Sequence, residues 1–123
     1  MNEYLEKRKR AFGYAWNGIM TLFQREAHAK IHLWVAEVVI IAGLIFNLTR
    51  MEWCVIILCI GGVFMAEGFN TAIERVCDKV SPEKNPLIKD AKDIAAGAVL
   101  LFVLAAVAIG LLIFVPKIIL LFN

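Results

Sequence analysis

The chain has 123 residues, of which 61% are apolar and 20% are charged, and its formal net charge is +2. Soluble globular domains contain roughly 45–50% apolar residues, so this composition excludes an ordinary soluble enzyme, and the length leaves room for one domain. We therefore expect residues 1–123 to form a single all-α membrane protein domain.

The N-terminal segment, residues 1–29, has the period of an amphipathic helix. Six apolar side chains fall within about 100° of one another at 100° per residue. They are Leu5, Phe12, Trp16, Ile19, Met20 and Phe23, and a basic run occupies residues 7–10. Aromatic side chains on one face beside basic residues are typical of a helix in the membrane interface. We predict a surface helix here; the alternative is a helix packed on soluble protein.

Three long apolar stretches follow, and each is predicted to be a transmembrane helix. The last is the clearest, because no charged residue occurs between Ile94 and Pro116. A helix of about 22 residues reaches roughly 33 Å, which is enough to cross the hydrocarbon core of a bilayer. We place the spans at residues 30–48, 52–79 and 90–115.

The distribution of basic residues predicts the orientation. Three spans put residues 1–29 and the loop 80–89 on one side of the membrane. Of the 13 basic residues, only Arg50 and Lys117 fall on the other side. Cytoplasmic segments carry an excess of Lys and Arg, so we expect the N-terminus and the 80–89 loop in the cytoplasm.

The cytoplasmic end of the second span carries a polar stripe. Its members are spaced 3, 4 and 4 apart and share one helix face within about 80°. They are Glu67, Asn70, Glu74 and Asp78. Acids in a membrane segment are costly and therefore indicate function, and such oxygen ligands suit Mg²⁺ and substrate phosphates. Three carboxylates on one stripe repel one another, so we expect Lys92 or a metal ion to balance their charge. The alternative is a set of hydrogen bonds or ion pairs that holds helices together.

A second polar group opens the third span. Asp90 and Asp93 can be explained as acids at a helix N-terminus, which the helix dipole favours. Lys92 beside Asp93 is more informative, because a lysine and a metal-binding carboxylate are what a triphosphate needs. The sequence has no Walker-type loop, so nucleotide binding would be of a different kind.

These residues resemble a known family. The run from Glu67 to Asp78 reads E-x-x-N-T-A-I-E-x-x-x-D, and A-K-D follows at residues 91–93. This long pattern is similar to the signature of the prokaryotic diacylglycerol kinase and undecaprenol kinase family. The resemblance covers about residues 7–115.

The resemblance implies a fold and an activity. Family members are small kinases of the bacterial inner membrane, with a surface helix and three spans, and they form homotrimers whose active sites lie between neighbouring subunits on the cytoplasmic side. They transfer the γ-phosphate of Mg-ATP to a membrane lipid alcohol. The expected cofactors are therefore Mg²⁺ and ATP, and we expect no nucleic-acid partner.

The resemblance also implies residue roles. Glu67 matches the general base, and Glu26 and Glu74 match the metal ligands. The positions that match contacts to the nucleotide are Tyr14, Asn70, Glu74, Asp78, Lys92 and Asp93.

The family resemblance indicates the reaction more clearly than the lipid substrate. The diacylglycerol kinase pattern has an acidic residue at the position of His32 and a serine at that of Ala96, whereas this sequence looks more like the undecaprenol kinase branch. We therefore expect undecaprenol, with Glu67 and His32 near it, and keep diacylglycerol as the alternative. A small transporter or a channel subunit is a more distant alternative; the transporter would need four spans and a lone buried acid.

Glu37 has no counterpart in the family pattern. It lies about 10 Å into the first span, where an unpaired charge is costly. We expect it to be protonated or paired in the subunit interface; a substrate role is the sharper alternative.

Overall fold

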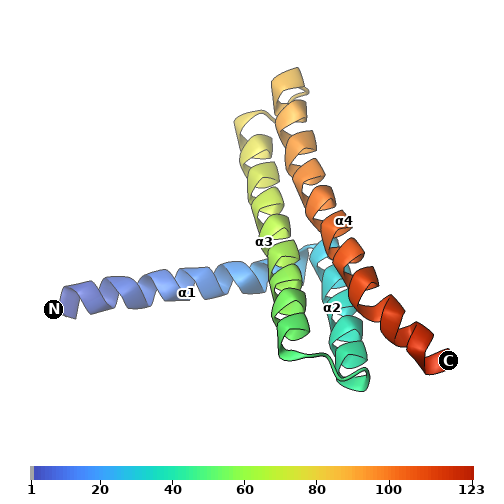
Figure 1. The fold of residues 1–123 in the computed structure, drawn as a ribbon. Coiled ribbons are helices and arrows are strands. Elements are labelled where there is room, and N and C mark those ends of the chain that lie inside the picture. Colours follow the sequence, from blue (N-terminus) through green and yellow to red (C-terminus); the bar gives the residue numbers. More distant parts are fainter. Residues whose placement is uncertain (1) are drawn as a thin grey trace.

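The computed structural model describes residues 2–123, and the described chain forms four helices (Figure 1). Their bounds are α1 Asn2–Arg25, α2 Ala27–Ile45, α3 Arg50–Val80 and α4 Pro86–Phe122. The helices α2, α3 and α4 are long and apolar enough to cross a membrane. They run antiparallel in sequence order, while α1 projects sideways from them (Figure 1). The expected all-α architecture with three candidate spans is confirmed.

A tight turn joins α2 to α3. Asn47 has a positive φ of 53°, a conformation that asparagine tolerates better than most residues. The Leu48 amide donates to the Gly43 carbonyl, so the end of α2 is closed by the hydrogen bond of a Schellman motif. Thr49 and Glu52 then form a reciprocal capping box that starts α3.

The turn between α3 and α4 uses other local signals. The Asn85 side chain accepts a hydrogen bond from the Leu87 amide, and Pro86 occupies the first position of α4, where a missing N–H costs nothing. The helix then continues through Pro116 to Phe122. Lys117 beyond this proline pairs with Glu52 at 3.1 Å, which ties the end of α4 to the start of α3.

The packing between helices depends on small residues. A Cβ at Gly62 would enter the ring of Phe102, and a Cβ at Gly43 would meet the Trp53 ring. Ala29 is fully buried. Helices in a membrane gain nothing from the hydrophobic effect between themselves, so close contact through small residues takes its place.

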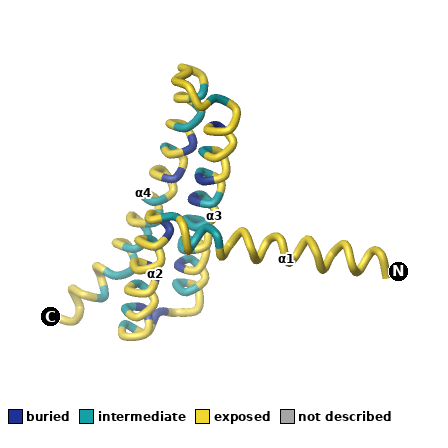
Figure 2. Tube along the Cα trace, turned by 180° about the vertical axis from the view of Figure 1, so that it is seen from behind, coloured by how far each residue is buried: buried dark blue, intermediate teal, exposed yellow. Residues whose placement is uncertain are grey.

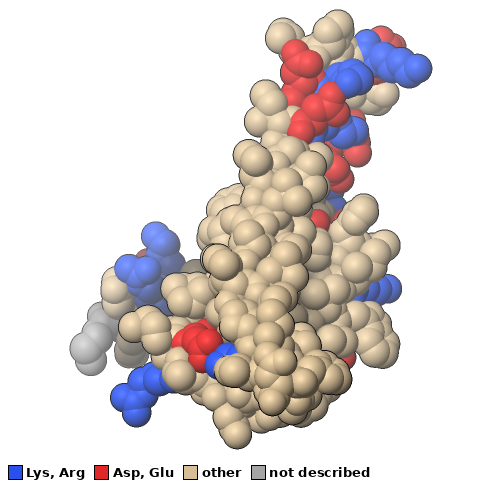
Figure 3. All heavy atoms as spheres, turned by 45° about the vertical axis from the view of Figure 1, so that its right-hand side comes forward, with Lys and Arg blue, Asp and Glu red and all other residues tan. Residues whose placement is uncertain are grey.

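Most large apolar side chains are exposed, and exposed positions occur along all four helices (Figure 2). None of the described side chains is both large and fully buried. In water such a surface would aggregate, whereas lipid covers it without cost. Charged residues instead gather at the far end of the α3–α4 hairpin (Figure 3).

The lengths of the helices explain that charged end. By residue count α2 is about 28 Å long, whereas α3 is about 46 Å and α4 about 55 Å. Because α2 alone matches the thickness of a hydrocarbon core, the last part of α3 and the first part of α4 extend past it.

The chain bends between α1 and α2 at Glu26, whose backbone is extended with φ −101° and ψ 118°. The bend precedes the boundary expected at residue 29. On α1, the Phe23 ring packs edge-on against Phe64 of α3 with 5.0 Å between centroids, and Leu22 lies beside Gly68. These contacts with α3, which are remote in sequence, fix the direction in which α1 leaves the bundle.

Candidate active site

The polar stripe on α3 runs from a buried end to an exposed one. Glu67 is 5% exposed, and Thr71, one turn further, is also buried. Asn70 and Glu74 are half-buried, and Asp78 is exposed. The stripe therefore connects the interior of the bundle with the charged end of the hairpin.

Glu67 has one partner, and it comes from α2. Its Oε1 lies 3.1 Å from Nε2 of His32, which is half-buried. Burial of a carboxylate is tolerated only when hydrogen bonds replace its water. The contact places two of the residues expected near the lipid next to each other, although 35 positions separate them in the sequence.

An apolar cleft of about 170 Å³ begins at His32 and is formed by α2, α3 and α4. Its walls otherwise hold aliphatic and aromatic side chains, one cysteine and one glycine. They are Val35, Ala36, Val39, Ile56, Cys59, Ile60, Val63, Phe64, Val103, Ala106, Val107 and Gly110. Glu67 thus lies one hydrogen bond from the polar end of a cleft whose other walls suit a hydrocarbon chain.

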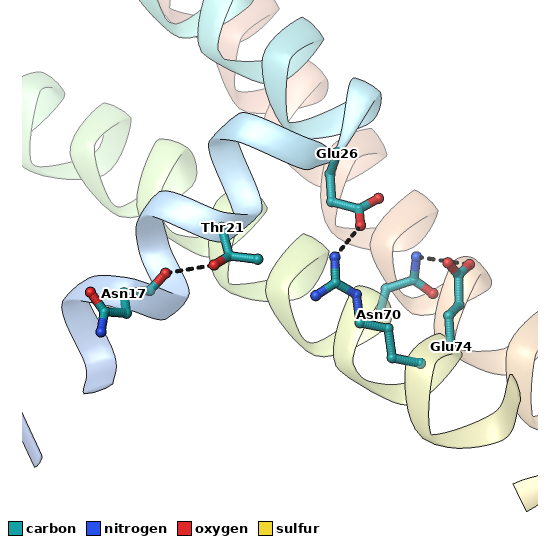
Figure 4. A network of polar contacts seen from close by, with 6 residues as sticks. Asn17, Thr21, Glu26, Asn70 and Glu74 are labelled. Carbon is teal, nitrogen blue, oxygen red and sulfur yellow. Dashed lines mark hydrogen bonds and ion pairs between the residues drawn. The ribbon is translucent and has the colours of Figure 1, made fainter. Parts of the chain in front are cut away.

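Asn70 and Glu74 form the next layer of the stripe (Figure 4). The Asn70 Nδ2 donates to Glu74 Oε1 at 3.4 Å. The Asn70 Oδ1 is buried and has no hydrogen-bond partner among residues 2–123. A buried carbonyl oxygen without a partner is expensive, so this oxygen is suited to contact with a bound ligand.

Glu26 meets a residue that the sequence analysis missed. Its Oε1 accepts from Nη2 of Arg75 at 3.1 Å, across the gap between the α1–α2 bend and α3 (Figure 4). The sequence assigned no partner to Arg75, because its side chain leaves α3 beside the stripe rather than within it. The bend at Glu26 brings the two together, and no local pattern in the sequence indicates that bend.

Two ion pairs lie at the tip of the α3–α4 hairpin. Lys92 donates to Asp78 at 2.6 Å, and Lys89 donates to Asp93 at 2.6 Å. Both pairs border an open groove of about 810 Å³, which Glu74 also lines. Lys92 is therefore the cation that balances Asp78 within one chain.

The structure does not bring all of the expected site residues together in one chain. Tyr14 is 72% exposed on α1, and its position is about 16 Å along the helix from Arg25. Glu26 and Glu74 have different partners. Within the described residues, no three acidic, histidine or cysteine side chains are grouped closely enough to hold a metal ion.

Comparison with known proteins decides the family. Residues 13–114 match the family model described as prokaryotic diacylglycerol kinase. The chain belongs to this family. The family's match begins in the middle of α1 and ends near the end of α4, so it includes every expected site residue.

Three relatives carry kinase names. The chain is 43% identical to the undecaprenol kinase of Bacillus subtilis over 88% of both chains. It is 39% identical to the diacylglycerol kinase of Synechocystis over 81% of this chain and 58% of that one. It is 32% identical to the diacylglycerol kinase of Pseudomonas aeruginosa over 72% of both chains.

These findings confirm the activity class expected from the sequence. The protein is a membrane protein and a lipid kinase. Membership in a kinase family implies the use of ATP. The small transporter and the channel subunit are thereby excluded as alternatives.

Proposed function

We propose that this kinase transfers the γ-phosphate of ATP to the hydroxyl group of undecaprenol and releases undecaprenyl phosphate and ADP. The observation that carries the proposal is the position of Glu67. This carboxylate is 5% exposed, its partner is His32, and that histidine forms the polar end of an apolar cleft. A lipid alcohol whose chain enters the cleft presents its hydroxyl at this end.

Glu67 is proposed as the general base. It removes the proton of the lipid hydroxyl as the oxygen bonds to the γ-phosphorus, while the bond to the β–γ bridging oxygen breaks and ADP leaves. His32 holds the carboxylate and fixes its direction. Phosphoryl transfer depends mainly on alignment and on neutralised charge, so the placement of this base matters as much as its strength.

The nucleotide is proposed to bind at the exposed end of the stripe. Lys92 and Asp93 border the open groove at the hairpin tip together with Glu74 and Asp78. In this proposal Lys92 leaves its ion pair with Asp78 and pairs with the phosphates of the nucleotide. Tyr14 is assigned to this site only because its position matches a nucleotide contact in the family pattern.

We propose that a magnesium ion binds beside Asn70 and Glu74. Glu74 and the unpartnered Asn70 Oδ1 are neighbouring oxygen donors on one helix face, and hard oxygen ligands suit Mg²⁺. Glu26 is proposed as a further ligand, in exchange for its contact with Arg75. The ion, when bound, neutralises phosphate charge and orients the γ-phosphate.

We infer that the working unit is a homotrimer with shared active sites. Glu26 and Tyr14 belong to the segment that projects from the bundle, whereas Asp78 and Lys92 lie at the tip of the hairpin. A neighbouring subunit can supply the missing half of such a site. We propose that the N-terminus and the hairpin tip face the cytoplasm, where ATP is available. The excess of basic residues on that side supports this orientation.

Two observations favour undecaprenol over diacylglycerol. The similarity to the undecaprenol kinase of Bacillus subtilis covers most of both chains. Among residues 2–123, the lining of the cleft has polar groups only at His32 and Cys59. An alcohol with a plain hydrocarbon chain fits such walls, whereas the two ester groups of diacylglycerol would lack hydrogen-bond donors close to the hydroxyl.

The substrate is tested by offering undecaprenol and diacylglycerol separately, in mixed micelles with labelled ATP and Mg²⁺. We expect label in undecaprenyl phosphate and at most slow transfer to diacylglycerol. Faster transfer to diacylglycerol would make phosphatidic acid the product and overturn the substrate proposal. Absence of transfer to either lipid would contradict the proposed reaction.

Shared sites are tested by mixing inactive subunits. Glu26→Gln and Glu74→Gln are each expected to remove activity. If one active site draws these residues from different subunits, mixed trimers contain one intact site and regain a fraction of the activity. Mixtures that stay as inactive as the separate variants would contradict sharing of the site between these two residues.

A further inference from the structure

The match to the family model does not include the first part of α1. The family match begins at residue 13, yet α1 begins at Asn2 and remains exposed up to Met20 (Figure 2). The additional segment, residues 2–12, contains the basic run at 7–10. None of the site residues assigned above lies in this segment.

The apolar stripe of α1 faces the apolar side of the bundle. Its last member, Phe23, touches Phe64, which lies on the apolar part of α3 before the polar stripe begins at Glu67. At 100° per residue, Leu5 points in the same direction as Phe23, and Phe12 deviates by about 20°. The stripe therefore faces the side on which the membrane spans lie.

Nothing within the described chain covers this stripe beyond its contact with α3. Phe12 is 78% exposed and Trp16 is 60% exposed. The helix α1 projects sideways from the bundle (Figures 1 and 2). A bilayer that surrounded the spans up to the level of Phe64 would therefore lie beneath this stripe. The lipid interface is then the surface that covers it.

The basic run is divided between two directions. At 100° per residue, Arg8 lies about 60° to one side of the stripe and Lys9 about 40° to the other. Lys7 and Arg10 point about 160° and 140° away from it. Arg8 lies over the Tyr4 ring at 5.0 Å, and the ion pairs among residues 2–123 involve neither Arg8 nor Lys9.

We propose that Arg8 and Lys9, with Leu5 and Phe12 between them, form a binding site for the headgroups of anionic phospholipids. Long basic side chains beside an apolar stripe bury their stems and place their charges at the level of the phosphates. Anionic headgroups carry a net negative charge that attracts Arg8 and Lys9, whereas zwitterionic headgroups carry none. The site anchors the far end of α1 to the membrane surface.

The choice of lipid over protein follows from the same geometry. A second protein would have to enter between α1 and the bilayer to reach the stripe. A bilayer around the spans would fill that layer with lipid. The two cations on the opposite face, Lys7 and Arg10, point toward water and do not take part.

The test measures which lipid lies next to the site in the full chain. The reporter is Phe12→Trp in a background in which the native tryptophans at 16, 34 and 53 are replaced by phenylalanine. The protein is reconstituted in nanodiscs of phosphatidylcholine with a minor fraction of phosphatidylglycerol. Bromine, which quenches tryptophan fluorescence at short range, is carried by the chains of one lipid or of the other.

We expect brominated phosphatidylglycerol to quench the reporter more than its share of the lipid predicts. Each basic side chain near an anionic membrane surface contributes about a fivefold preference. The double variant Arg8→Gln/Lys9→Gln is expected to remove the excess, and added salt to weaken it. The matched control Lys7→Gln/Arg10→Gln changes the charge by the same amount and is expected to keep it.

Three results would overturn the inference. Quenching by the two lipids in proportion to their amounts would show that anionic lipid is not selected. Equal effects of the two double variants would show that only overall charge matters. Absence of quenching by either lipid would show that lipid does not cover the stripe. The assay does not use phosphate transfer, so these outcomes leave the proposed function untouched.

Discussion

Replacement of Glu67 by glutamine separates chemistry from folding. The two side chains have the same shape, and glutamine can still form a hydrogen bond with His32, which lies 3.1 Å from Glu67. One hydrogen bond is therefore exchanged for another, and we expect the free energy of unfolding to change by less than about 1 kcal/mol. The amide, however, cannot accept the proton of the lipid hydroxyl.

The expected loss of activity follows from the role of a general base. Such a group contributes typically 10²- to 10⁴-fold to the rate, which is roughly 3–5 kcal/mol in the barrier. We expect the turnover number of Glu67→Gln to fall by this factor. The KM for ATP is expected to stay near the wild-type value, because Glu67 acts on the lipid hydroxyl and not on the nucleotide.

The assay is transfer of labelled phosphate from ATP to undecaprenol in nanodiscs, with thermal unfolding followed in parallel. Glu3→Gln is the control, because this exposed residue on α1 undergoes the same chemical change far from the cleft. Activity of Glu67→Gln within about threefold of the wild type, in a folded protein, would refute the assignment of the base. A comparable loss in Glu3→Gln would show that the effect does not come from the site.

Two further predictions concern the nucleotide and the packing. Lys92→Gln removes the cation beside the open groove, so we expect the KM for ATP to rise by roughly 10- to 100-fold, as for a lost charge-assisted hydrogen bond. The control Lys79→Gln makes the same charge change outside the groove and is expected to leave the KM for ATP unaltered. Equal KM values for the two variants would contradict the nucleotide site. Gly62→Ala places a methyl group in the ring of Phe102, whereas Gly61→Ala meets open space. We expect the free energy of unfolding in detergent to fall by about 1–3 kcal/mol for Gly62→Ala and to change little for Gly61→Ala. Equal stability of the two variants would mean that α3 and α4 pack differently.

The chain past Pro116 illustrates how tertiary contacts decide a local question. A proline inside a helix removes one hydrogen bond and often ends the helix. Here α4 continues to Phe122. Lys117 reaches Glu52 on α3 at 3.1 Å, and lipid provides no water to solvate a broken helix end. The sequence alone left open whether the third span ends at this break or kinks there into a tail on the outer surface.

The sequence by itself determined the features that depend on local pattern. Helical spans follow from unbroken apolar runs, because a helix is the way for one segment to satisfy its own backbone hydrogen bonds in lipid. The polar stripe follows from spacings of three and four residues, because the helix period places those residues on one face. The family signature also lies on this stripe, and for this reason the lipid kinase activity could be predicted before the fold was known.

Only the tertiary structure decided the features that join distant segments. The contact between His32 and Glu67, the apolar cleft beside it and the pairing of Glu26 with Arg75 all depend on how the other three helices pack against α3. Helix period fixes the direction of a side chain within its own helix, but not which helix it meets. The packing of small residues and the bend at Glu26 choose the neighbours, and a pattern of single residues does not contain that information.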